Sequence, residues 1–106
     1  MKRVILESPY AGDVETNTRY ARACLLDSLQ RGEAPFASHL LYTQVLDDAI
    51  SGEREAGIEA GLVWGDAAVA TVVYTDLGVT RGMQQGIERA HAEGRMVIYR
   101  RLWESV

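Results

Sequence analysis

The sequence predicts an α/β fold in which a small, doubly wound parallel sheet of about four strands is flanked by helices. The main observation is an alternation along the chain. Short apolar runs rich in β-branched residues are separated by longer stretches in which apolar residues recur at helical intervals. Strands that alternate with helices form parallel sheets with helical crossovers. The length of 106 residues suits one packed core, so we expect a single domain over residues 1–106.

Four segments have the composition of strands. Residues 4–6 (Val-Ile-Leu) are fully apolar and precede a turn with Pro and Gly, which predicts a buried strand. Residues 69–74 are the clearest strand, because they are β-branched and apolar on both faces, as the centre of a parallel sheet requires. Residues 34–37 are weaker, since Pro35 suits only an edge or a first strand position. Residues 96–99 form the last predicted strand, followed by a short tail.

The segments between these strands have helical periodicity. The first helix is expected over about residues 16–30, with Asp13 or Thr16 as its cap and Gly32 closing it. Two more helices are predicted over 38–50 and 53–64, and a last helix begins near Met83 and ends at Gly94. With this element order, the sheet is expected to be flavodoxin-like or Rossmann-like.

Composition excludes several classes of function. Acidic residues outnumber basic ones 15 to 11, so the net charge is -4, which argues against a nucleic-acid polymer or a polybasic membrane anchor as partner. The single cysteine, Cys24, cannot form an internal disulfide and falls on the buried stripe of the first helix, where it should pack. Neither a signal peptide nor an apolar run of about 20 residues is visible, so we expect a cytoplasmic protein without a membrane partner.

The aromatic residues predict self-association. Trp64, Tyr99 and Trp103 are a large aromatic surface for a core of this size, so we expect a homodimer or a higher homo-oligomer.

Ligands of open parallel sheets bind beyond the carboxyl ends of the strands, and two loops should meet there. The first contains Ser8, Pro9, Tyr10 and Gly12, whose hydroxyl and backbone N–H groups could receive a phosphate or a ribose hydroxyl. A plain turn is an equally good interpretation. The loop lacks the glycine-rich patterns of nucleotide-binding motifs.

The second loop follows the strand at 69–74. Asp76 is placed to accept hydrogen bonds from sugar hydroxyls, and Thr80 is both a helix cap and a candidate phosphate ligand, with Gly82 and Met83 beside it. The alternative is that Asp76 and Thr80 only satisfy backbone groups. His39 follows the predicted second strand and is a further ligand-binding candidate. Because the chain has only two histidines, His39 and His91, we expect no metal site. We also expect no cofactor.

The segments Ser8-Pro9-Tyr10, Pro35 to His39 and Asp76 to Met83, continued by Ile87 and Ala90, resemble the nucleoside 2-deoxyribosyltransferase-like superfamily. That group includes 2'-deoxynucleoside 5'-monophosphate N-glycosidases and small relatives common in phages. The resemblance spans residues 4–99 and rests on the order of the motifs. It implies a nucleoside or nucleotide ligand and a Glu nucleophile that attacks the sugar, with a second group protonating the leaving base.

The position that matches this nucleophile is Gly86. In the superfamily the Glu lies six residues after the counterpart of Thr80 and four before that of Ala90. Glu88 cannot replace it, because two residues along a helix turn a side chain by about 200°. Asp76 is then the only acid expected in the pocket. Gly86 itself leaves room for a larger ligand or for contact with helix backbone.

Three hypotheses follow. The leading one is non-catalytic binding of a nucleotide or an ADP-ribose-like signalling molecule, for example by a small sponge that sequesters it. The second is an N-glycosidase or deoxyribosyltransferase of altered chemistry, in which Asp76 activates water. The third is a structural or protein-interaction role. Binding leads because it needs only the loops, whereas an enzyme of this type without its nucleophile loses orders of magnitude in rate.

Overall fold

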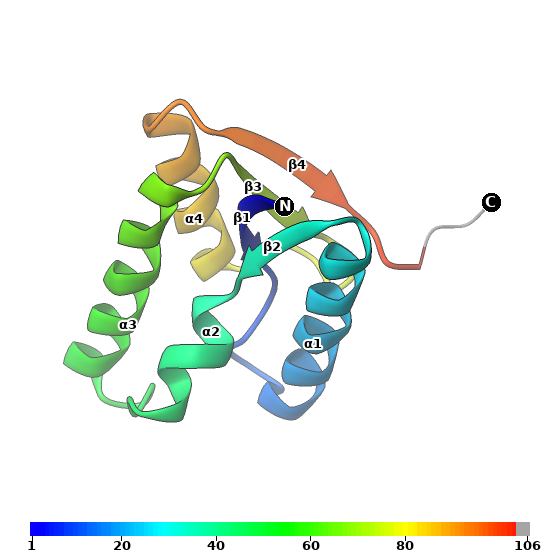
Figure 1. Ribbon diagram of the computed structural model, residues 1–106. Coiled ribbons are helices and arrows are strands. Elements are labelled where there is room, and N and C mark those ends of the chain that lie inside the picture. Colours follow the sequence, from blue (N-terminus) through cyan, green and yellow to red (C-terminus); the bar gives the residue numbers. More distant parts are fainter. Residues whose placement is uncertain (104–106) are drawn as a thin grey trace.

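The computed structural model describes residues 1–103 and has a four-stranded parallel sheet with helices on both faces, which confirms the predicted α/β fold (Figure 1). In chain order the elements are β1 (Lys2–Glu7), α1 (Val14–Gln30), β2 (Glu33–Phe36), α2 (Ser38–Leu41), the 3-10 helix η1 (Tyr42–Gln44), α3 (Ser51–Val63), the 3-10 helix η2 (Trp64–Ala67), β3 (Ala70–Tyr74), α4 (Arg81–Ala92) and β4 (Met96–Arg100). The last residues of the predicted tail, 104–106, lie outside the described part.

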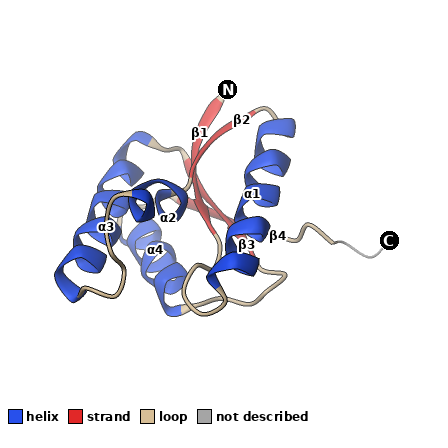
Figure 2. Cartoon of the chain, turned by 90° about the horizontal axis from the view of Figure 1, so that it is seen from below, coloured by secondary structure: helices blue, strands red, loops and turns tan. Residues whose placement is uncertain are grey.

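The strand order is β2-β1-β3-β4, and all three neighbouring pairs are parallel. Helix α1 covers one face of the sheet, while α3 and α4 lie on the other (Figure 2). From β1 the chain moves outward to β2, then crosses back to β3 on the other side of β1. The direction of winding therefore reverses between β1 and β3. A crevice opens at such a reversal point in doubly wound folds, and it is where their ligands bind.

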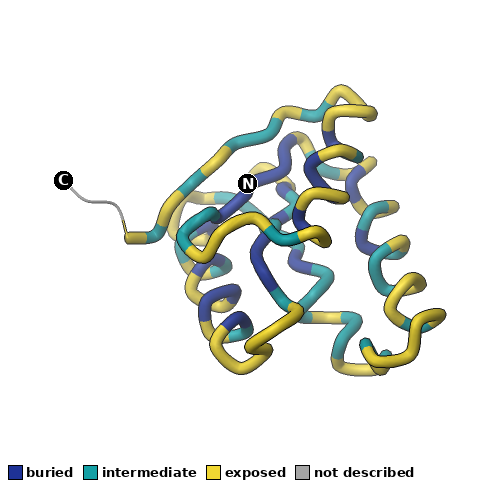
Figure 3. Tube along the Cα trace, turned by 180° about the vertical axis from the view of Figure 1, so that it is seen from behind, coloured by how far each residue is buried: buried dark blue, intermediate teal, exposed yellow. Residues whose placement is uncertain are grey.

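The sheet separates two apolar clusters. On the α1 face, Leu6 and Val72 pack with Tyr20 and Cys24 of the helix. On the opposite face, the smaller cluster is Val73, Met83 and Ile87, with Val97 against it. Figure 3 shows the buried residues running along the strands and the inward sides of the helices. Successive side chains of a strand point to opposite faces of the sheet, which divides the two clusters. The same alternation determines which side chains reach the crevice.

Cys24 packs in the α1 cluster, as its position in the sequence predicts. Its burial raises the pKa of the thiol to about 12, so the side chain is an apolar filler and not a nucleophile at neutral pH.

Most element boundaries lie within one or two residues of the prediction, and two of the differences bear on the cavity described below. The helix predicted over residues 38–50 is wrong: α2 and η1 end at Gln44 and a loop follows. In that loop, Oδ1 of Asp47 accepts a hydrogen bond from the backbone N–H of Ala49, and Glu53 accepts one from the N–H of Asp47. These side chains give the backbone an alternative to the helical ladder. The second difference is at β1, which extends to Glu7 through pairing with Val73 of β3.

No helix within residues 1–103 combines the length and the apolar character needed to cross a lipid bilayer.

Candidate functional site

A cavity of about 510 Å³ lies beyond the carboxyl end of β1. Its walls come from the loop after β1, from α2, from the inner side of α3 and from the first turns of α4. Drug-sized and nucleoside-sized ligands occupy cavities of roughly 300–1,000 Å³. The cavity therefore has the size and the place in the fold of a small-molecule site. Its walls include seven of the residues that the sequence put forward, namely Ser8, Tyr10, His39, Thr80, Gly82, Met83 and Gly86.

Ser8 and His39 form a hydrogen-bonded pair in this cavity. Oγ of Ser8 lies 2.7 Å from Nε2 of His39, and the serine is only 5% exposed. Burial lowers the pKa of His39 to about 4, so its ring is neutral at neutral pH. The helix that carries His39 lies close to α3, because a Cβ atom at Gly61 would meet Oγ of Ser38 at 2.5 Å. The pair joins two segments that lie 31 residues apart.

The loop after β1 contributes less than the sequence suggested. Tyr10 lines the cavity, whereas Pro9 and Gly12 do not. The side-chain amide of Asn17 donates to the carbonyl groups of Tyr10 and Ala11 at 3.0 and 3.1 Å, which fixes the loop against α1. Gly12 has a φ of 102°, a turn conformation that favours glycine. Pro9 and Gly12 thus shape the loop.

The N-terminus of α1 is not part of the cavity either. Oδ1 of Asp13 accepts from the backbone N–H of Thr16 at 3.2 Å, and its Oδ2 accepts from the Thr16 hydroxyl at 2.8 Å. This carboxylate already caps the helix end that could have received a phosphate. The cap expected at Asp13 or Thr16 is therefore Asp13.

The N-terminus of α4 does face the cavity. The hydroxyl of Thr80 accepts a hydrogen bond from the N–H of Met83 at 3.3 Å, which is the capping role weighed as the alternative. Thr80, Arg81 and Gly82 nevertheless line the cavity. The first turn of α4 thereby brings a cationic side chain and the positive end of a 12-residue helix to the site.

Asp76 lies outside the cavity, and its expected place in the pocket is corrected. Its Oδ1 accepts from the Tyr20 hydroxyl at 2.6 Å and from the N–H of Leu102 at 2.8 Å, and its Oδ2 accepts from the N–H of Trp103 at 3.1 Å. The side chain is only 1% exposed. Burial alone would raise the pKa of Asp76, but these hydrogen bonds lower it below its ordinary value. Asp76 anchors the segment after β4 to α1.

Glu7 is the acid that the sheet contributes to the cavity, whereas Asp48, Glu53 and Glu55 line it from α3 and the loop before it. Glu7 was not among the predicted site residues. Its side chain leaves β1 on the face opposite Leu6 and lines the cavity beside α4. A Cβ atom at Gly86 would overlap Cδ and Oε2 of Glu7. The Glu7 carboxyl group therefore fills the space that a side chain at position 86 would occupy. An acidic residue directly after a fully apolar strand was the available signal.

The surroundings of Glu7 favour its protonated form. Burial raises the pKa of its carboxyl group to about 8, and the nearby positive charge of Arg95 opposes this only in part. Arg95 also lines the cavity and is held by its own partners: Nε donates to the Thr71 hydroxyl at 3.0 Å and Nη1 to the Gly65 carbonyl at 2.9 Å. A carboxyl group with such a pKa can donate a proton near neutral pH.

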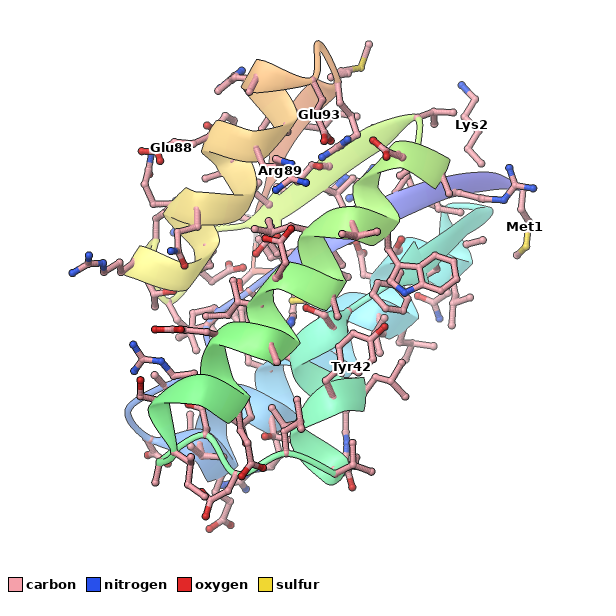
Figure 4. The ribbon with its side chains drawn as sticks, turned by 90° about the vertical axis from the view of Figure 1, so that its left-hand side faces the viewer. Met1, Lys2, Tyr42, Glu88, Arg89 and Glu93 are labelled. Atoms are coloured by element: carbon pink, nitrogen blue, oxygen red, sulfur yellow. The ribbon has the colours of Figure 1, made fainter. Side chains whose placement is uncertain are left out.

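Glu88 is exposed on α4 and does not line the cavity. In Figure 4, Glu88 points away from α3, whereas its neighbour Arg89 points toward α3. The prediction that Glu88 turns away from the position of Gly86 is confirmed.

Comparison with known proteins identifies one family. A domain of unknown function, DUF7768, matches residues 2–100, which include every element from β1 to β4. No curated protein matches the chain. The resemblance to the nucleoside 2-deoxyribosyltransferase-like superfamily stays a prediction. By this match over nearly its whole length, the chain belongs to the DUF7768 family.

Proposed function

We propose that the protein binds a nucleoside or a nucleotide in the cavity beyond the carboxyl end of β1. The observation that carries the proposal is the coincidence of this cavity of about 510 Å³ with the reversal point between β1 and β3. Doubly wound sheets bind nucleotides and related ligands at that place. The resemblance of the motifs in the loops after β1 and β3 to those of nucleoside-processing proteins supports the same ligand class.

The polar groups of the cavity suit the parts of such a ligand. The hydrogen-bonded Ser8 and His39 can meet sugar hydroxyls, and Tyr10 offers an aromatic ring to a base. Arg81 and the first turn of α4 offer positive charge to a phosphate. These cationic groups can pair with the phosphate of a nucleotide, although Asp48, Glu53 and Glu55 line the same cavity.

The expectation of a non-catalytic protein stays a prediction. It rests on the absence of a carboxylate at position 86, and Glu7 places a carboxyl group at the same wall of the cavity. Sequestration of a nucleotide remains the simplest form of the proposed binding.

A thermal-shift screen tests the binding. The panel contains nucleosides, nucleoside 5'-monophosphates, cyclic dinucleotides and ADP-ribose. A ligand at 100 times its Kd stabilises the folded state by about 2.7 kcal/mol, which corresponds to a rise in Tm of about 10 °C for a domain of this size. We expect at least one phosphorylated compound to produce such a shift.

Two arginine variants sharpen the test. Arg81→Ala removes a cation from the cavity wall and should weaken a phosphorylated ligand, whereas Arg22→Ala changes an exposed residue of α1 and should have no effect. The proposal fails if no compound at millimolar concentration shifts the Tm of the unmodified protein. It also fails if the two variants weaken the ligand equally.

A further inference from the structure

We propose that the outer edge of β4 is a self-association surface, on which β4 of a second copy of this chain pairs antiparallel about a two-fold axis at Ile98. The pairing joins two four-stranded sheets into one continuous sheet. No residue of β4 lines the cavity, so the inference concerns a separate surface and does not depend on the proposed function.

The first ground is that β4 is an open edge of the sheet. It is the last strand in the order β2-β1-β3-β4 and pairs with β3 on one side (Figure 1). Within residues 1–103, no strand pairs with its other side. Natural sheets protect their edges with proline, with charge or with very short strands. The opposite edge strand, β2, has four residues and contains Pro35, whereas β4 has five residues and no proline.

The second ground is that the charges along this edge are already paired within the chain. Arg100, the only charged residue of β4, forms an ion pair with Glu33, and its side chain is only 9% exposed. Arg95, directly before the strand, forms an ion pair with Glu93 at 2.7 Å. Two identical copies of β4 can therefore approach each other without bringing unpaired like charges together.

The third ground is the direction of the peptide groups of β4. The N–H of Thr75 donates to the carbonyl group of Arg100 at 2.9 Å, so the peptide groups of Arg100 face β3. These groups alternate in direction along a strand. Those of Ile98 therefore also face β3, while the N–H and C=O groups of Val97 and Tyr99 point outward.

One symmetric register pairs all of these outward groups. With Ile98 on the two-fold axis, Val97 of one copy lies opposite Tyr99 of the other, and the reverse pair is its symmetry mate. Each of the two pairs exchanges two N–H···O=C hydrogen bonds, as hydrogen-bonded pairs of antiparallel strands do. The edge of β4 is thus complementary to itself.

The side chains also match in this register. Val97 packs on the α4 face of the sheet, and Tyr99 lies on the same face because it is two residues further along the strand. Contact between Val97 and the other copy's Tyr99 is a pairing of a β-branched with an aromatic side chain, which stabilises antiparallel strands. On the α1 face the two Ile98 side chains meet. A strand of a different protein would lack this symmetric match, which favours a second copy as the partner.

The size of the contact sets its strength. Three large side chains on or next to β4 are 57–65% exposed, namely Met96, Tyr99 and Trp103. A fully buried aromatic side chain contributes about 150–250 Å². Five paired residues with these side chains therefore bury less than the roughly 800 Å² per partner of a standard interface. We expect a reversible dimer with a Kd of about 1–100 μM.

Sedimentation velocity over about 1–200 μM protein brackets this Kd and tests the surface. Tyr99→Lys places a charge on the edge and removes the aromatic contact. Val45→Lys is the matched control, because it adds the same charge at a 78% exposed apolar residue in the loop after η1. We expect the unmodified protein and Val45→Lys to dimerise alike, and Tyr99→Lys to dimerise at least about tenfold more weakly. Circular dichroism checks that each variant is folded.

Cysteine cross-linking tests the register. The native Cys24 is buried, so an introduced cysteine is the reactive one. Residues that face each other at position 98 have Cα atoms about 4.5 Å apart, which suits a disulfide. Met96→Cys is the control: Met96 is 65% exposed, but its two copies lie about 13 Å apart along the paired strands. With oxidised glutathione, Ile98→Cys should form a covalent dimer and Met96→Cys should not.

Three results would overturn the inference. The first is an unmodified protein that is monomeric at about 200 μM, twice the weakest expected Kd. The second is a folded Tyr99→Lys variant that dimerises as strongly as the unmodified protein. The third is a Met96→Cys variant that cross-links at least as fast as Ile98→Cys, which would exclude the register centred on Ile98.

Discussion

Substitution of Gly86 by alanine perturbs one contact and leaves the rest of the helix unchanged. The new methyl group would overlap Cδ and Oε2 of Glu7, so the carboxyl group has to move. Gly82 provides a matched control, because it lies in the same helix and a Cβ atom there meets nothing within 4 Å.

Two opposing effects set the magnitude. Alanine in place of glycine within a helix stabilises a protein by about 0.4–1 kcal/mol. Overpacking costs about 1–3 kcal/mol, and the lower end applies here because the displaced atoms end a flexible side chain. Gly86→Ala should therefore leave the free energy of unfolding nearly unchanged in the presence of Glu7. In a Glu7→Ala background the overlap is absent, and the same substitution should stabilise by up to about 1 kcal/mol.

A double-mutant cycle by denaturant unfolding measures this difference. We expect a coupling free energy of about 1 kcal/mol or more between positions 7 and 86, and none between positions 7 and 82. Equal effects of Gly86→Ala in both backgrounds would refute the claim that the Glu7 carboxyl group fills the space of the missing side chain.

Three further predictions concern stability and assembly. The raised pKa of Glu7 means that the folded state binds the proton more tightly than the unfolded state, so the contribution of Glu7 to stability is lost as the pH rises from about 4.5 to about 8. Glu7→Gln should thus be more stable than the unmodified protein at pH 8 and similar to it at pH 4, and an equal difference at both pH values would contradict this. Asp76→Ala should lower the free energy of unfolding by about 2–3 kcal/mol, because it leaves the Tyr20 hydroxyl and two backbone N–H groups without their acceptor; an unchanged Tm would contradict the anchoring role. Light scattering should give at least twice the monomer mass of 11.7 kDa, because three large aromatic residues are more than half exposed, namely Trp64, Tyr99 and Trp103. A monomer mass would contradict that expectation.

Most of the fold follows from local patterns in the sequence. The β-branched run of β3 and the apolar periodicity of α1 and α4 predict their elements, because burial of one face or of both faces determines residue type along each segment. The helix predicted over residues 38–50 is wrong beyond η1, because Asp47 and Glu53 bind backbone N–H groups of the loop. Such side-chain competition leaves no trace in the spacing of apolar residues.

The location of the site was predictable from the sequence, whereas the roles of its acidic residues were less so. The rule that ligands bind at the carboxyl ends of parallel strands places Ser8, His39 and Thr80 at one cavity. The alternative given for Asp76, that it satisfies backbone groups, agrees with the bonds it accepts from the N–H groups of Leu102 and Trp103. These partners were not predictable, because the segment after β4 is distant in sequence. Glu7 was missed because the predicted strand ends at Leu6, one residue before the end of β1. The direction of the Glu7 side chain could therefore not be derived from strand alternation.

The protonation of Glu7 is the central claim, and its direct test is the titration of that carboxyl group. The chemical shift of the Glu7 side-chain carboxyl carbon can be followed by NMR from pH 4 to pH 10, with assignment from the spectrum of Glu7→Gln. We predict a single transition at a pKa of about 8, caused by burial of the carboxyl group at the cavity wall. A transition near the ordinary value of 4.5 would mean that Glu7 is ionised at neutral pH, and it would contradict the predicted pH dependence of stability.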